Sequence, residues 1–204
     1  REIKDELIRQ IQKQIRKQFG STPLNNKNYG KIINEKHFTR ICNLIDPSKV
    51  VCGGDNNPGA LQIAPTVMDN VTFGDAIMQE EIFGPVLPVL TYDSLDEAIE
   101  KVNSMAHPLA LYIFTSDKEA AEKVTSHCGF GGGCVNDTII HLATSEMGFG
   151  GFGESGMGYY PGTDGFHTFS HYKSIVDKKT WLDLPMRYQP YRKIYEKLLR
   201  KFLK

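Results

Sequence analysis

The first fifty residues show the spacing of amphipathic helices. In residues 2–19 apolar side chains recur about every four positions along a charged segment, and Gly20 follows. This spacing predicts a helix that ends at the glycine. A second helix is expected after Asn34, with four apolar residues on its buried face. These residues are Phe38, Ile41, Leu44 and Ile45.

Short apolar runs bounded by Gly or Pro predict strands between and after these helices. The runs at 49–52 and 61–68 are the first two, and Pro65 interrupts the second. Three longer runs follow and are separated by helical patterns. They cover residues 86–92, 110–115 and 132–136.

Two capping signatures start the helices between these three strands. Ser94 with Glu97 and Ser116 with Glu119 both have the S-x-x-E spacing of a capping box. The resulting order is β-α-β-α-β, whose crossover helices imply neighbouring parallel strands. We therefore expect an α/β fold with a parallel-rich sheet and flanking helices.

The C-terminal part has three different patterns. Residues 148–165 contain eight glycines in eighteen positions, and residues 166–176 alternate as a strand would. Residues 190–204 predict an amphipathic helix. Its apolar face comprises Tyr191, Ile194, Tyr195, Leu198 and Phe202.

Composition narrows the class of protein. With 204 residues, 40% hydrophobic residues and a formal net charge of zero, the chain fits a globular protein and gives no reason to expect nucleic-acid binding. Its four cysteines are irregularly spaced, which favours a reducing, cytoplasmic compartment over a disulfide scaffold or metal site. The last twenty residues carry seven Lys or Arg and one acid, Glu196, so adsorption to an anionic membrane is a weaker alternative for the tail.

Several apparent motifs lack the context that their chemistry requires. The segment "GFGGFGESG" contains G-x-G-x-x-G twice without a preceding strand and following helix, so a loop of close backbone approach is favoured over a dinucleotide fingerprint. Ser155 has no nucleophile elbow around it. His167 and His171 are expected as a pair on a sheet face, and each cysteine as a small buried residue. No catalytic or metal-binding residue is assigned.

Adjacent carboxylates precede a large aromatic residue in "MQEEIFGPVLPVL", residues 78–90. Glu80 and Glu81 come just before Phe83 and the Gly84-Pro85 turn. This pattern fits either a solvated acidic loop or a ligand site at the mouth of a sheet. The residues by themselves leave the choice open.

The whole motif resembles the E-E-x-F-G-P motif of the aldehyde dehydrogenase superfamily. Further segments resemble the same family in the same order, and the S-G-M-G and F-S-H details are most similar to its class 3 branch, which includes fatty aldehyde dehydrogenases. These segments are KIINEKHFTRI (31–41), IAPTV (63–67), PLALYIFT (108–115), GGGCVNDTIIHLA (131–143) and GFGGFGESGMGYYPGTDGFHTFSHYKSI (148–175).

The resemblance implies roles for two residues of the motif. Glu81 would hold the hydroxyls of the nicotinamide ribose of NAD or NADP, and Phe83 would pack near the nicotinamide. Glu80 would be a structural partner, and the loop 148–158 would shape the aldehyde pocket. Two departures from the family pattern are Gly148 and Pro161, which stand where proline and histidine are common.

The resemblance also implies that the chain corresponds to the C-terminal part of such an enzyme. The G-Q-x-C motif of the nucleophilic cysteine and the E-L-G-G motif of the general base do not occur in it. The intact enzyme would oxidise an aldehyde to a carboxylic acid through a cysteine thiohemiacetal. The alternative is a non-catalytic α/β module that binds a partner or a membrane surface through its basic C-terminal helix.

Two regions are expected. Residues 1–165 would form the C-terminal part of the catalytic domain, and residues 166–204 an oligomerisation strand followed by the amphipathic helix. The strand from Phe169 to Lys178 would cross to a second subunit in a homodimer. The helix would dock on the enzyme's own body, near the substrate entrance.

Overall fold

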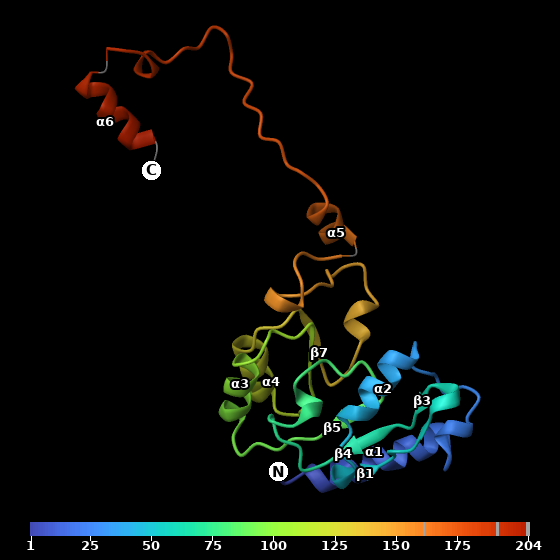
Figure 1. Cartoon of the computed structure of the whole chain (residues 1–204). Helices are drawn as coiled ribbons and strands as arrows, with labels where there is room; N and C mark the ends of the chain where they lie inside the picture. The colour runs from blue at the N-terminus through green and yellow to red at the C-terminus, as the bar shows by residue number, and fades with distance from the viewer. Residues whose placement is uncertain (161, 191, 203–204) are drawn as a thin grey trace.

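The computed structural model has small groups of paired strands with helices around them, and a long C-terminal arm (Figure 1). It describes residues 1–160, 162–190 and 192–202. The helices are α1 (Lys4–Phe19), α2 (Glu35–Leu44), α3 (Leu95–Asn103), α4 (Lys118–His127), α5 (Gly162–Thr168) and α6 (Lys193–Phe202). The strands are β1 (Val50–Cys52), β2 (Asn56–Asn57), β3 (Gln62–Ile63), β4 (Thr66–Met68), β5 (Val86–Pro88), β6 (Ala110–Ile113) and β7 (Gly132–Val135).

The two N-terminal helices form where the apolar spacing predicts them. Asn34 caps α2, because its side-chain oxygen accepts a hydrogen bond of 2.9 Å from the backbone N–H of His37. Phe38 and Ile41 are buried, as expected. The apolar stripe of α1 is less well covered, since only Ile8 is fully buried.

A three-stranded sheet in the order β1-β4-β5 lies beside these helices. β1 and β4 are antiparallel, whereas β4 and β5 are parallel. Pro65 separates β3 from β4, as the sequence predicts. Gly53 is required here, because a Cβ atom at this position would lie 2.2 Å from the Pro65 carbonyl oxygen.

The unit β6-α4-β7 is the predicted parallel crossover, with register from Ala110↔Gly132 to Ile113↔Val135. The expected pairing of β5 with β6 is wrong for the described residues, where β5 pairs only with β4. β5 ends early at Pro88, which has no N–H to donate to a further strand. The α/β class therefore holds, but the sheet is divided.

One of the two predicted helix caps is shifted by a residue. Ser94 caps α3 and accepts a hydrogen bond of 3.2 Å from the N–H of Glu97. At α4 the cap is Asp117 rather than Ser116. Its carboxylate accepts hydrogen bonds from the N–H groups of the two residues after Lys118, and an ionised acceptor satisfies these free donors well.

The strand predicted for 166–176 is absent from the described part of the chain. Residues 162–168 form α5, which runs across the boundary expected at residue 165, and His167 lies in this helix. The predicted sheet-face pair of His167 and His171 is therefore wrong. An alternating pattern becomes a strand only when a neighbouring strand accepts and donates its hydrogen bonds, and this segment has no such neighbour among the described residues.

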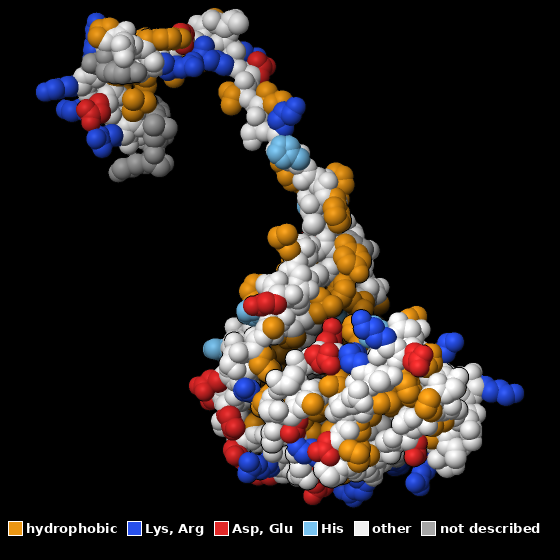
Figure 2. All heavy atoms as spheres, viewed as in Figure 1, with side chains coloured by type: hydrophobic (Ala, Val, Ile, Leu, Met, Phe, Trp, Pro, Cys, Tyr) orange, Lys and Arg blue, Asp and Glu red, His pale blue; other side chains and the backbone are white. Residues whose placement is uncertain are grey.

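An arm without regular pairing extends from α5 to α6 and carries α6 away from the body (Figure 1). Apolar side chains are scattered along it in the space-filling view (Figure 2). The apolar face of α6 is not buried on the described part of the body, since Ile194 is 63% exposed and Leu198 37% exposed. The expected docking of this helix on the intact enzyme stays a prediction. Tyr191, the side chain of Phe202, and Pro161 lie outside the described residues. No helix in the described ranges is long and apolar enough to cross a membrane.

The main core lies between α2 and the β1-β4-β5 sheet, and Ile41 is fully buried at its centre. Changing Ile41 to alanine is expected to lower the free energy of unfolding by about 2–5 kcal/mol, because it leaves a cavity among packed side chains. Urea unfolding of the purified chain measures this loss. Ile33→Ala is the matched control, since Ile33 is 82% exposed and should unfold as the wild type does. Equal unfolding midpoints for the two variants would contradict this picture of the core.

Candidate functional site

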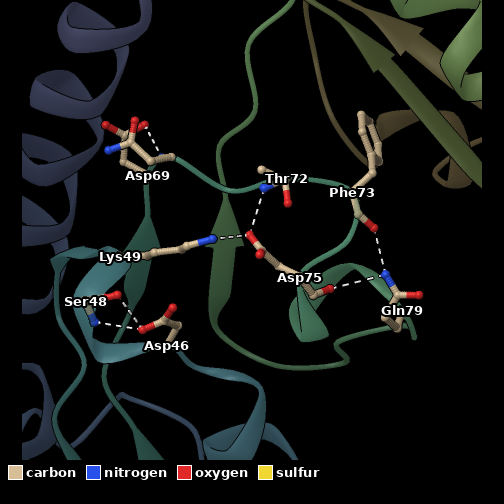
Figure 3. A network of polar contacts seen from close by, with 9 residues as sticks. Asp46, Ser48, Lys49, Asp69, Thr72, Phe73, Asp75 and Gln79 are labelled. Carbon is tan, nitrogen blue, oxygen red and sulfur yellow. Dashed lines mark hydrogen bonds and ion pairs between the residues drawn. The ribbon is translucent and has the colours of Figure 1, made fainter.

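The segment between β4 and the E-E-I-F-G-P motif is fixed by a network of polar contacts (Figure 3). Lys49 forms an ion pair with Asp75, whose carboxylate also accepts a hydrogen bond of 2.8 Å from the N–H of Thr72. The hydrogen bond from Lys49 lowers the pKa of Asp75 below its usual value. The Gln79 side-chain amide donates to the Phe73 carbonyl at 2.7 Å. These contacts therefore fix the position of the loop that precedes the motif.

Burial of an apolar side chain also restrains the segment just before the motif. Ala76–Met78 form a short 3-10 helix, and Ile77 within it is only 1% exposed. Asp46 orders the turn that presents Lys49, because its carboxylate accepts a hydrogen bond of 2.9 Å from the N–H of Ser48. Hydrogen bonds from the side chain and the backbone of Ser48 together lower the pKa of Asp46. Burial of Ile77 and the polar contacts of Lys49 together fix the segment that leads to Glu80.

The backbone of the motif turns sharply at Phe83. This residue has φ of +49°, in the left-handed region that side chains larger than hydrogen rarely adopt. Gly84 follows and packs onto α2, where a Cβ atom would lie 2.8 Å from Ile41 Cδ1. The Pro85 carbonyl then accepts a hydrogen bond of 2.8 Å from the Thr66 N–H. The turn delivers the chain into β5 and leaves Phe83 on the surface, 80% exposed.

The two carboxylates of the motif have different environments. Glu80 Oε2 lies 3.4 Å from Arg40 Nη1, which fits the expected structural role of this residue. The side chain of Glu81 is exposed beside the turn. The Arg40 guanidinium also donates to the carbonyls of Glu81 and Ile82, at 3.2 and 2.7 Å. One arginine therefore holds the backbone at the candidate site.

An open pocket of about 580 Å³ lies beside the Phe83 ring. Its other walls come from the segment before α2 and from the first turn of that helix. The lining residues are Lys31, Ile32, Ile33, His37 and Phe83. An exposed aromatic face next to a hollow of this size can pack against a planar ring system.

The chemistry of the exposed pair fits a ribosylated cofactor. A carboxylate offers two acceptor oxygens, so Glu81 can accept hydrogen bonds from two neighbouring hydroxyl groups. Phe83 presents an apolar face only two residues away on a fixed turn. The arrangement can orient a ring that carries a sugar diol, whereas neither residue offers the thiol that a thiohemiacetal requires.

The glycine segment forms the expected close-approach loop. Phe149 and Tyr160 pair across its base, and the Tyr160 N–H donates to the Phe149 carbonyl at 2.8 Å. A Cβ atom at Gly150 would lie 2.0 Å from the Gly158 carbonyl oxygen. His107 hydrogen-bonds to Glu154 and lowers the pKa of that carboxyl to about 2. This hydrogen bond holds the tip of the loop against the segment before β6.

Three of the four cysteines lie in surroundings that disfavour a nucleophilic role. All four cysteines are free, and burial raises the pKa of Cys42, Cys52 and Cys128, which disfavours the nucleophilic thiolate. Cys134 Sγ lies 3.5 Å from His141 Nδ1, and aromatic rings surround that histidine. Across the described ranges, no group of three or more His, Cys, Asp or Glu side chains could hold a metal ion.

The sequence places Glu81 and Phe83 at the site but does not reveal Arg40. Arg40 lies on α2 and is separated from Glu81 by 41 residues. Its position in a helix next to Ile41 is also typical of an ordinary solvated arginine. The signal that could have found it is the E-E pair itself, since a structural role for Glu80 is served by a nearby cationic side chain.

Comparison with known proteins identifies a family of similar sequence and fold. The family model described as "Aldehyde dehydrogenase family" matches residues 1–175. The chain is 44% identical over 192 residues to 4,4'-diaponeurosporen-aldehyde dehydrogenase of Staphylococcus aureus, covering 93% of this chain and 42% of that protein. It is 41% identical over 174 residues to "Aldehyde dehydrogenase, dimeric NADP-preferring" of Mus musculus, covering 85% of this chain and 38% of that protein.

A solved structure that is similar to this chain is described by the same kind of name as these relatives. The structure described as "Substrate bound state of Staphylococcus Aureus AldH" has a TM-score of 0.90 and 43% sequence identity, and the match covers 100% of this chain and 44% of that one. The protein is therefore an α/β polypeptide with the fold of aldehyde dehydrogenases. It belongs to the aldehyde dehydrogenase family, and it spans about two fifths of the length of the curated relatives that it matches.

Proposed function

We propose that this chain is the C-terminal portion of an NAD(P)-dependent aldehyde dehydrogenase that oxidises aldehydes to carboxylic acids through a cysteine thiohemiacetal. The nucleophilic cysteine would lie upstream of Arg1. The observation that carries the proposal is the E-E-I-F-G-P turn, in which Glu81 and Phe83 are both exposed on a backbone held by Arg40. The family match over residues 1–175 supports it and disfavours a non-catalytic module.

In this enzyme, bound NAD or NADP supplies the hydride acceptor. Glu81 accepts hydrogen bonds from the nicotinamide ribose hydroxyls. Phe83 packs near the nicotinamide and restricts its orientation, which favours transfer along one geometry. The loop 148–158 shapes the aldehyde pocket, because its glycines allow close backbone approach where side chains would fill the space.

We also propose that the enzyme is a homodimer in which Phe169–Lys178 crosses to the second subunit. The support is the exposure of the arm, because large apolar side chains in water favour burial against a partner. The exposed large apolar residues of this stretch are Phe169 (85%), Tyr172 (69%), Ile175 (78%) and Val176 (89%). A cytoplasmic location completes the proposal, and the four free cysteines are compatible with a reducing compartment.

A comparison of two proteins tests the proposed activity. The full-length gene product is expected to reduce NAD or NADP when hexanal or benzaldehyde is added. The 204-residue chain alone is expected to show no such reaction, because it contains neither a G-Q-x-C nor an E-L-G-G motif. Absorbance of the reduced cofactor measures both, with the aldehyde omitted as the control.

Two outcomes would overturn this assignment. Aldehyde-dependent reduction by the short chain would move the nucleophile to one of its own four cysteines. A full-length protein that binds neither cofactor would favour the non-catalytic module. Co-sedimentation with anionic vesicles that is lost on deletion of residues 187–204 would point to a membrane-binding role for α6 in that case.

A further inference from the structure

The contacts of Arg40 connect α2 to the backbone of the candidate site. Its guanidinium donates through Nη1 to the Glu81 carbonyl at 3.2 Å and through Nη2 to the Ile82 carbonyl at 2.7 Å. The same Nη1 lies 3.4 Å from the Glu80 carboxylate. The planar fork of the guanidinium thus spans three consecutive residues immediately before Phe83.

Arg40 is itself held in place. Its side chain is only 22% exposed. In the sequence of α2, Arg40 stands between Phe38 and Ile41, the two buried residues of this helix. The Glu80 carboxylate supplies the opposite charge, so the guanidinium is paired while its remaining donors serve the backbone. A charge-assisted hydrogen bond of this kind is about twice as strong as a neutral one.

The strain at Phe83 explains why the backbone needs such a contact. A left-handed conformation at a bulky residue persists only where its surroundings enforce it. After Phe83, Gly84 packs on Ile41, and the Pro85 carbonyl accepts a hydrogen bond from the Thr66 N–H. Before Phe83, the described contacts to the backbone of Glu81 and Ile82 come from Arg40.

We propose that Arg40 is a positioning residue that fixes the Glu81 and Ile82 carbonyls and thereby orients both Glu81 and Phe83 toward the nicotinamide riboside. This inference rests on the proposed function of those two residues. Without the fork, Phe83 relaxes out of the left-handed region and the Glu81 carboxylate loses its fixed direction. The turn must then be ordered each time the cofactor binds, which costs binding free energy.

Lysine cannot replace this arginine. Lysine keeps the positive charge and can still pair with Glu80, but its ammonium is a point charge without a planar fork. Arg40→Lys therefore separates the charge from the two carbonyl contacts. Glu80→Gln makes the opposite change, because it removes the ion pair and leaves the fork to the Glu81 and Ile82 carbonyls in place.

The experiment compares full-length wild type with Arg40→Lys, Arg40→Gln and Glu80→Gln. Arg9→Gln is the control, since Arg9 is an exposed arginine of α1 that contacts only Glu6 among the residues described. Hydrogen exchange of the amides of residues 81–84 is measured on the cofactor-free protein. Calorimetry gives the dissociation constant of the oxidised cofactor, and single-turnover kinetics give the hydride-transfer rate.

Arg40→Lys and Arg40→Gln are expected to speed exchange at residues 81–84 and to weaken cofactor binding by about tenfold to a hundredfold. Glu80→Gln should change both less than tenfold, and Arg9→Gln should change neither. If a variant at position 40 is unstable, the exchange of α2 amides reports it, and the other variant carries the comparison.

Wild-type exchange and wild-type affinity in both Arg40 variants would overturn the inference, provided that Glu81→Gln does weaken cofactor binding. If Glu81→Gln leaves binding unchanged, the proposed cofactor role is wrong. Faster exchange at residues 81–84 in Arg40→Lys would still be seen in that case, and it would show that the arginine orders the turn independently of any cofactor role of Glu81.

Discussion

Replacing Glu81 by glutamine in the full-length enzyme is expected to slow hydride transfer by about tenfold to a hundredfold. The carboxylate is exposed and forms no part of the core, so its loss acts on the ligand. An ionised acceptor contributes about 1.5–3 kcal/mol to hydrogen bonds that a neutral amide makes less well. A glutamine keeps the size of the side chain but offers one acceptor oxygen in place of two.

Stopped-flow measurement of reduced-cofactor formation tests this expectation, together with a binding isotherm for the oxidised cofactor. Glu122→Gln on α4 is the matched control, because Glu122 is also exposed and lies outside the motif. The thermal midpoints of both variants should equal that of the wild type. A Glu81→Gln enzyme with wild-type transfer rate and affinity would remove Glu81 from the ribose.

Ending the full-length chain at Thr168 is expected to convert the proposed dimer to a monomer. This truncation removes the arm with its exposed Phe169, Tyr172, Ile175 and Val176. Full burial of one such side chain contributes about 1.5–3 kcal/mol, so the four together should shift the dissociation constant by more than about a thousandfold. Sedimentation equilibrium at micromolar concentration measures the shift.

A second truncation separates the arm from the terminal helix. A chain that ends at Leu184 keeps Phe169–Lys178 and loses α6, and it should remain a dimer. The proposal is contradicted if the chain ending at Thr168 still dimerises, or if the untruncated protein is a monomer at micromolar concentration. Loss of the dimer in both truncations would place the contact in α6.

Local patterns predicted the elements whose hydrogen bonds are local. Asn34 and Ser94 cap helices, and α2 buries Phe38 and Ile41 where the spacing places them. Each of these features depends on residues three or four positions apart, which is the range over which helical hydrogen bonds and side-chain spacing operate. The parallel pair of β6 and β7 followed for a similar reason, because a crossover helix of this length permits few other arrangements.

The pairing of strands depended on distant parts of the chain. The alternating apolar and polar residues after Phe166 do not form a strand, since residues 162–168 are helical and no neighbouring strand among the described residues pairs with this segment. β5 likewise pairs with β4 alone and ends at Pro88. Backbone hydrogen bonds between strands join residues far apart in sequence, so a pattern within one segment cannot specify its partner.

Some features of the candidate site could also be predicted from the sequence, whereas others required the folded structure. Consecutive residues were enough to show that Glu81 and Phe83 stand together before a Gly-Pro turn, and the family resemblance gave that pair its expected role. The folded chain was needed to show that Phe83 adopts a left-handed backbone and that Arg40, 41 residues from Glu81, holds the carbonyls beside it. The reason is that a motif consists of consecutive residues and can be recognised in the sequence. The orientation of its side chains depends on contacts that exist only after α2 has packed against the sheet.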